Sequence, residues 1–217
     1  LTVGGKAPAQ VALDVLLARA QVKEPLGQYD AALTDVEQVL SQANEQHLTP
    51  MQASAYAQKA RLLRLMAQPD EAISCVEEAI KLYREGHDIR GEAMALSVLG
   101  ELRSDRAELE KFESTLRQAL VLARLGDLEW LEAKMLTLLG TACIQQGKMG
   151  EAPEHLLAAA ETYRRIGDRR GMASSYLMLG RVEHATGNSR DAVAHVEEAY
   201  AIFHEMGDQP MRVASLV

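Results

Sequence analysis

Side chains that could act as nucleophiles or metal ligands are scattered along the chain and form no catalytic or metal-binding motif. The six histidines make no His-x-x-x-His pair and no cluster with Cys75 or Cys143. The segment from Gly140 to Lys148 differs from a phosphate-binding loop, because its two glycines are too widely spaced and Met149 follows the lysine where a hydroxyl is required. We therefore predict that the protein is not an enzyme, has no metal site and needs no cofactor.

The composition indicates a helical protein of the cytoplasm. Helix-forming residues dominate, and aromatic residues make up only 4% of the chain. Lys and Arg total 23 against 31 for Asp and Glu, and the net charge of −8 argues against binding to nucleic acid or anionic lipid. Cys75 and Cys143 lie among apolar neighbours, which favours buried, reduced thiols. No segment approaches the roughly 18 apolar residues of a membrane span, so we expect no membrane association.

A repeat of 40 residues organises the chain. The segments EAMALSVLG, EAKMLTLLG and MASSYLMLG end at Gly100, Gly140 and Gly180, and Ala20 and Ala60 stand in the same column of the repeat. Two helices of a hairpin can approach closely only where the side chains between them are small, so this column predicts their seam. Large apolar columns flank it and make each predicted helix amphipathic: Leu16, Tyr56, Leu96, Leu136 and Tyr176 on the first helix, and Val36, Val76, Leu116, Leu156 and Val196 on the second.

Glycines mark the expected ends of the helices. Gly27, Gly147 and Gly187 fall where the first helix of a repeat should end, and glycine adopts the left-handed cap conformation at little cost. Between repeats stands a Gly-Asp pair whose aspartate could cap the following helix, at 126–127, 167–168 and 207–208. The pattern predicts a lead-in at 1–9 and one array over 10–217, with repeats at 10–50, 51–91, 92–130, 131–171 and 172–207 and a partial sixth repeat at 208–217.

The segments LSVLGELRS, LTLLGTACIQQGKMGEA and YLMLGRVEHATGNSRDA resemble tetratricopeptide repeats. They are closest to the 40-residue variety of the LGN/Pins scaffolds and of MalT-like bacterial regulators. The resemblance covers nearly the whole chain. It implies an all-α fold, a right-handed α-solenoid of antiparallel helix-turn-helix repeats.

Some residues depart from the pattern of the family. Phe112 occupies a column of small residues, and Arg19 and Lys59 occupy a column that holds leucine in later repeats. The third repeat reads as one residue short in its second helix and one residue long in the loop Leu128-Glu129-Trp130. We expect a local distortion between repeats three and four and a more solvent-open first hairpin.

The resemblance also implies a concave groove lined by the first helix of each repeat. The candidates are residues that point away from the seam: Leu17, Gln21 and Glu24; Ala57, Arg61 and Arg64; Ser97, Glu101 and Asp105; Thr137, Thr141 and Gln145; and Ser174, Leu177, Arg181 and His184. Arg61 with Arg64 forms a basic spot, as does Arg181 with His184, and such spots could bind carboxylates through charge-assisted hydrogen bonds. Glu101 and Asp105 form an acidic spot. The alternative is that all these residues belong to ordinary solvated helix faces.

Trp130 is the only tryptophan of the chain and falls in a predicted loop beside Leu128 and Leu131. An aromatic residue in a loop could anchor a partner protein. The alternative is that Trp130 packs on the following helix and fixes its start.

These features favour an interaction scaffold that binds a peptide or helix of a partner protein in its groove. The alternative is a ligand- or peptide-sensing domain of a larger bacterial signal-transduction or transcription regulator. An enclosed pocket with convergent polar groups would favour a small-molecule sensor, and an open channel would favour a peptide. Self-association is a further expectation, because an uncapped last hairpin would expose Val213, Leu216 and Val217.

Overall fold

The computed structural model describes residues 8–207, with side chains from Gln10 onward. The predicted partial sixth repeat at 208–217 lies outside the described residues, and so do the three apolar residues expected to support self-association. The described chain divides into two compact units, with their boundary between Arg106 and Ala107. One array over 10–217 therefore stays a prediction, and each unit is described by itself.

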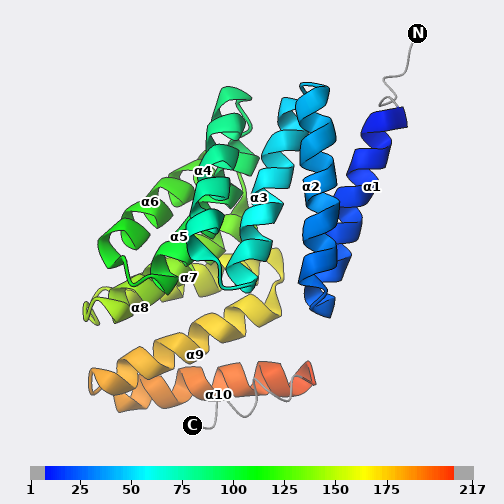
Figure 1. The fold of residues 1–217 in the computed structure, drawn as a ribbon. Coiled ribbons are helices and arrows are strands. Elements are labelled where there is room, and N and C mark those ends of the chain that lie inside the picture. The colour runs from blue at the N-terminus through cyan, green and yellow to red at the C-terminus, as the bar shows by residue number, and fades with distance from the viewer. Residues whose placement is uncertain (1–7, 208–217) are drawn as a thin grey trace. The chain divides into compact units, whose positions relative to one another are not determined.

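Both units consist of antiparallel helical hairpins (Figure 1). In the first unit the helices are α1 (Pro8–Lys23), α2 (Tyr29–Glu45), α3 (Thr49–Leu65), α4 (Pro69–Glu85) and α5 (Ile89–Asp105), with a short 3-10 helix at Glu24–Leu26. In the second unit they are α6 (Leu109–Leu125), α7 (Glu129–Gln145), α8 (Ala152–Ile166), α9 (Arg169–Ala185) and α10 (Ser189–Glu205). The predicted all-α fold of helix-turn-helix repeats is confirmed. None of the described helices is long and apolar enough to cross a membrane.

The register of the repeat is regular throughout the described chain. Helices α3, α5, α7 and α9 begin at residues 49, 89, 129 and 169, which are 40 residues apart. The turns share this regularity, because the residues with left-handed backbone recur every 20 positions: Gly27, His47, Ala67, His87, Ala107, Asp127, Gly147, Gly167, Gly187 and Gly207. The predicted irregularity of the third repeat is therefore wrong.

The error came from reading Gly126 as the equivalent of Gly167. In the structure Asp127 takes the left-handed conformation, with φ 50°, and Gly126 only ends helix α6. Aspartate tolerates this conformation better than most residues. Asp127 consequently does not cap α7, whereas Asp88 and Asp168 do cap, each accepting a 2.8 Å hydrogen bond from the backbone N–H of Gly91 or Gly171.

The small column forms the seam between the helices of a hairpin, as predicted. A Cβ added to Gly140 would lie 2.7 Å from Cδ2 of Leu156, and one added to Gly180 would lie 2.6 Å from Cγ2 of Val196. Phe112, the exception in a neighbouring column, is fully buried in α6. Close approach at the glycines therefore lets the larger apolar residues of the facing helix fill the seam.

Arg19 and Lys59, the two cations in the column that holds leucine in later repeats, are paired with carboxylates of α2. Arg19 donates to both oxygens of Asp35, at 2.8 and 2.5 Å, and Lys23 Nζ lies 2.7 Å from the same carboxylate. Asp35 is 4% exposed, and the hydrogen bonds from Arg19 lower the pKa of its carboxyl. Lys59 lies 2.9 Å from Glu37. These polar pairs take the place of the leucine contacts expected in this column.

Candidate partner-binding faces

The first helices of successive repeats lie side by side within each unit. In the first unit α3 contacts both α1 and α5, and in the second unit α7 contacts α9. Gln58 donates to the carbonyl oxygen of Leu17 at 3.3 Å, which links α3 to α1, and the hydroxyls of Thr137 and Ser175 lie 3.4 Å apart between α7 and α9. The predicted groove residues lie on these first helices, except Glu24 in the 3-10 helix after α1. Leu17, Ser97 and Leu177 are buried, so these three do not line an open groove.

In the first unit the predicted basic and acidic spots bind one another. Arg64 lies 2.9 Å from an oxygen of Glu101 and 2.6 Å from an oxygen of Asp105. Arg61 lies 2.6 Å from an oxygen of Glu24. Gln21 is exposed on α1. The two arginines predicted to bind carboxylates of a partner already bind carboxylates of this chain.

The second unit presents basic side chains that pair with no described residue. Arg181 and His184 are exposed on α9, and no described residue forms an ion pair or hydrogen bond with either side chain. Thr141 donates to the carbonyl oxygen of Thr137 at 3.1 Å and faces the sulfur of Met178 at 4.0 Å. Gln145 is exposed at the end of α7.

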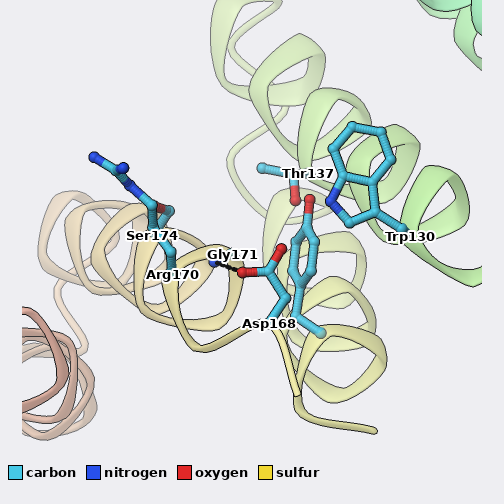
Figure 2. A pocket seen from close by; sticks show the side chains of 7 residues that line it. Trp130, Thr137, Asp168, Arg170, Gly171 and Ser174 are labelled. Carbon is cyan, nitrogen blue, oxygen red and sulfur yellow. Dashed lines mark hydrogen bonds between the residues drawn. The ribbon is translucent and has the colours of Figure 1, made fainter. Parts of the chain in front are cut away.

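A pocket of about 250 Å³ lies on this face of the second unit. Figure 2 shows Trp130 and Thr137 of α7 on one side and Asp168, Arg170 and Ser174 at the start of α9 on the other. Gly171 and Tyr163, the latter from α8, complete the lining. The cap hydrogen bond from Gly171 to Asp168 fixes the carboxylate at the edge of the pocket.

The missing side chain of Gly171 makes room for Tyr163. A Cβ at this position would lie 2.5 Å from the tyrosine ring, so only glycine lets the ring pack here. Burial raises the pKa of the Tyr163 hydroxyl, and a hydrogen bond with Thr137 lowers it in part. The tyrosine is therefore a fixed, neutral wall of the pocket at physiological pH.

Trp130 lies in the first turn of α7 and not in a loop, so the predicted location is wrong. The helix begins at Glu129, inside the predicted loop, because the register continues unbroken through the third repeat. The indole is 51% exposed, and Nζ of Lys134 lies 5.9 Å from its ring centroid. This distance permits a cation–π contact that orients the ring over the face of α7.

Tyr163 and Asp168 were missed as site residues by the sequence prediction. A signal for them exists, because YREGHDIRG at 83–91 and YRRIGDRRG at 163–171 repeat the same tyrosine, aspartate, arginine and glycine 80 residues apart. Tyr83 packs on Gly91 in the first unit as Tyr163 packs on Gly171 in the second. The motif therefore marks a junction between repeats.

The model of the tetratricopeptide repeat family matches residues 11–85 and 131–205, which is more than half of the chain. The chain belongs to the tetratricopeptide repeat family. Among curated proteins none matches its sequence. The fold of this tetratricopeptide repeat protein is nevertheless shared by many solved structures.

One similar structure is the apo form of RapI, with a TM-score of 0.82 and 15% identity over 91% of this chain and 72% of that one. A second is the kinesin light chain TPR-like repeats of Podosopora anserina, with a TM-score of 0.72 and 17% identity over 93% and 99% of the two chains. A third is a Rap protein complexed with Competence and Sporulation Factor, with a TM-score of 0.75 and 14% identity. This chain spans 55% of that Rap protein. The fold and the family together support a protein–protein interaction scaffold.

Proposed function

We propose that the second unit binds an acidic peptide or helix of a partner protein across the face of α7 and α9. The observation that carries this proposal is the pair Arg181 and His184, which is exposed and has no carboxylate of the described chain to neutralise it. Their spacing of three residues places both on one face of α9. An arginine in this setting can bind a carboxylate through two parallel hydrogen bonds.

The pocket supplies the apolar half of the proposed interaction. Its volume of about 250 Å³ lies below the roughly 300–1,000 Å³ of pockets that hold whole small molecules, so it suits one large side chain of a peptide. Trp130 and Tyr163 provide aromatic walls, and aromatic or branched aliphatic side chains gain most from burial in such a site. The anchor of the partner is therefore an aromatic or branched aliphatic residue.

The distance between the pocket and Arg181 predicts how far apart the two contacting residues of the partner lie in its sequence. Ser174 at the pocket and Arg181 are seven residues apart on α9, which is about 10.5 Å along the helix axis. An extended peptide covers this length with about three residues, at roughly 3.3 Å each. The expected partner sequence has an aromatic or aliphatic anchor and an Asp or Glu about three positions away. Thr141 and Gln145 of α7 would bind the backbone of that segment.

A phage-displayed library of random peptides tests the proposal. The wild-type chain should enrich peptides with the anchor and acidic residue at this spacing. The Arg181→Gln and Trp130→Ala variants should each weaken binding of an enriched peptide by about tenfold or more. Arg61→Gln is the matched control, because Arg61 stands in the same column of the repeat and is paired with Glu24.

Two results would contradict the proposal. One is an absence of enrichment by the wild-type chain, and the other is equal weakening by Arg61→Gln and Arg181→Gln. The second result would indicate that the binding face also includes the predicted groove residues of the first unit, among them Gln21, Arg64, Glu101 and Asp105.

A second candidate is a sensing domain of a larger bacterial regulator. The fold shared with a Rap protein that was crystallised with Competence and Sporulation Factor favours this role. A sensor should change its conformation when the ligand binds, whereas a scaffold should not. Small-angle scattering with and without an enriched peptide separates the two, since only a sensor predicts a change in the radius of gyration. In both roles the protein is a cytoplasmic binding protein without catalytic activity, cofactor or nucleic-acid partner.

A further inference from the structure

The carboxylate of Asp168 has one oxygen that binds the chain and one that does not. The first accepts the cap hydrogen bond from the backbone N–H of Gly171 at 2.8 Å. The second forms no hydrogen bond or ion pair with the residues that the structure describes, and Figure 2 shows it turned away from Gly171. Asp168 is half-buried and lines the pocket together with Trp130 and Tyr163. The pocket therefore contains a strong hydrogen-bond acceptor that is left to solvent or to a bound molecule.

The hydroxyl groups of the pocket do not select a ligand in the same way. Thr137 donates to the carbonyl oxygen of Ala133 at 3.0 Å and forms a hydrogen bond with the hydroxyl of Tyr163. These two hydroxyls are therefore satisfied within the chain. The hydroxyl of Ser174 can either donate or accept, so it does not distinguish between a donor and an acceptor. The second oxygen of Asp168 can only accept, and it therefore favours a ligand that donates.

The charges around the pocket favour a neutral donor over a cation. Arg170 contributes to the lining, and Nζ of Lys134 lies 5.9 Å from the ring centroid of Trp130. A lysine or arginine of a partner would have to enter beside these two cations, and like charges brought together oppose binding. The hydroxyl of a tyrosine and the indole N–H of a tryptophan donate hydrogen bonds without adding charge. Both side chains are also large aromatic groups that can pack against the aromatic walls of the pocket.

An anchor without a donor would bind less well because of the same oxygen. A leucine or phenylalanine that filled the pocket would displace water from the carboxylate of Asp168 and leave the second oxygen without a partner. An aromatic donor replaces the displaced water with a direct hydrogen bond to a charged acceptor, which is stronger than a bond between neutral groups. The pocket should therefore discriminate between tyrosine and phenylalanine, which differ by one hydroxyl.

We propose that Asp168 determines the specificity of the pocket, and that the anchor of the partner is a tyrosine or tryptophan that donates a hydrogen bond to its second oxygen. This inference rests on the proposed function, because it names the anchor of the peptide expected to bind across α7 and α9. It narrows the aromatic and branched aliphatic residues that the pocket volume allows to the two aromatic residues that carry a donor at the ring.

Asp88 of the first unit provides a comparison within the chain. It accepts the same cap hydrogen bond, from the backbone N–H of Gly91 at 2.8 Å. The residues around it differ, because Pro50, Ala57 and Met94 stand in the columns of the tryptophan, threonine and serine that line the pocket. The capping role is therefore common to both aspartates, and we expect selection of an aromatic donor only at Asp168.

Fluorescence anisotropy with two synthetic peptides tests the inference. Both have the sequence of a peptide selected from the phage library, with tyrosine at the anchor position in one and phenylalanine in the other. The wild-type chain should bind the tyrosine peptide about tenfold more tightly. In the Asp168→Ser variant the two peptides should bind about equally, because serine keeps an oxygen that caps α9 but places nothing at the position of the second oxygen. Asp88→Ser is the matched control and should keep the tenfold ratio.

The outcomes separate this inference from the proposed function. Equal binding of the two peptides by the wild-type chain overturns the inference, and so does a tenfold ratio that persists in Asp168→Ser or that is lost equally in Asp88→Ser. Each of these results leaves the proposed function intact, because the peptides still bind. Binding of neither peptide to the wild-type chain contradicts the proposed function and the inference with it. Circular dichroism checks that both variants fold, and the comparison on the wild-type chain does not depend on them.

Discussion

Helices α3 and α9 carry basic side chains in the same two columns of the repeat, but the two pairs have different surroundings. Arg61 and Arg64 of α3 bind Glu24, Glu101 and Asp105 of the first unit. Arg181 and His184 of α9 bind no described residue. The same two columns therefore pair with carboxylates of the chain in one unit and with no described residue in the other.

The junctions between repeats show a similar difference. Tyr83, Asp88, Arg90 and Gly91 of the first unit recur as Tyr163, Asp168, Arg170 and Gly171 of the second. Around this common frame, the pocket residues Trp130, Thr137 and Ser174 correspond to Pro50, Ala57 and Met94. The four recurring residues are part of the repeat fold in both units, whereas the residues around them differ between the units. Function in a repeat protein is therefore best sought where equivalent columns differ.

The largest expected effect is on the charges that hold the first unit. Asp35→Ala removes a buried carboxylate and leaves Arg19 and Lys23 without their partner, and we expect a loss of about 2 kcal/mol in the free energy of unfolding. Glu37→Ala on the same helix is the control and should cost about 0.5 kcal/mol, because its ion pair with Lys59 is exposed. Chemical denaturation measures both. Equal losses would remove the distinction between structural and surface charges in this unit.

The effect of pH follows from the direction of the shift at Asp35. Its folded-state pKa is lowered, so its contribution to stability is complete above the ordinary carboxyl pKa near 4 and is lost as the pH falls through the folded-state value. In the Asp35→Ala variant, the loss of stability in acid should be smaller than in the wild type. A variant with the same acid dependence as the wild type would contradict this account of Asp35.

Smaller effects are expected at the seam, which both units share. In Gly180→Ala the new Cβ lies 2.9 Å from the backbone oxygen of Ala192, which cannot move aside, and we expect a loss of about 1–2 kcal/mol. In Gly140→Ala the Cβ meets only the flexible side chain of Leu156, and the helix propensity of alanine offsets much of the strain. In thermal unfolding, Gly180→Ala should therefore have a lower Tm than Gly140→Ala. The reverse order would show that the seam of the second unit is described wrongly.

Glu113 is the charged group that stabilises the second unit itself. Its pKa is lowered to about 2 by hydrogen bonds from Arg117, Gln146 and Lys148. Since the folded-state pKa lies below the ordinary value of 4.5, the contribution is present above pH 4.5 and is lost as the pH falls toward about 2. Glu113→Gln should cost about 1 kcal/mol at neutral pH and almost nothing near pH 2. Unfolding curves at several pH values measure this, and a cost that does not depend on pH would contradict it.

The smallest expected effect is at Arg181. Arg181→Ala should change stability by less than about 0.5 kcal/mol, because the side chain is exposed and pairs with no described residue. Arg64→Ala should cost about 1 kcal/mol, because it removes the ion pairs with Glu101 and Asp105. Equal losses of stability in the two variants would mean that Arg64 and Arg181 contribute equally to the fold, and would contradict the difference between the two units.

The repeat made much of the fold predictable. Small residues every 40 positions identified the seam, and the contacts of Gly140 and Gly180 confirm it. The turn after α6 could not be read correctly, because Gly126 resembles a turn glycine and only the backbone shows that Asp127 takes that place. The displaced turn also moved Trp130 into a predicted loop.

The candidate site was harder to predict than the fold. The groove residues followed from the family, but which of them bind one another depends on the stacking of neighbouring first helices. Arg64 and Asp105 are one repeat and one residue apart, so the period places them on adjacent helices without showing that their side chains meet. The pocket required Tyr163 from a second helix, which the prediction of a groove lined by first helices did not include.

Hydrogen exchange of the wild-type chain, with and without a peptide enriched from the library, shows which of the two units binds the peptide. We expect slower exchange in α9 and at the start of α7, around Arg181 and Trp130, and no change in α3 around Arg61 and Arg64. Protection of α3 and α5 with none in α9 would rule out binding at Arg181, because a partner would then have displaced the internal ion pairs of the first unit and left Arg181 and His184 uncovered.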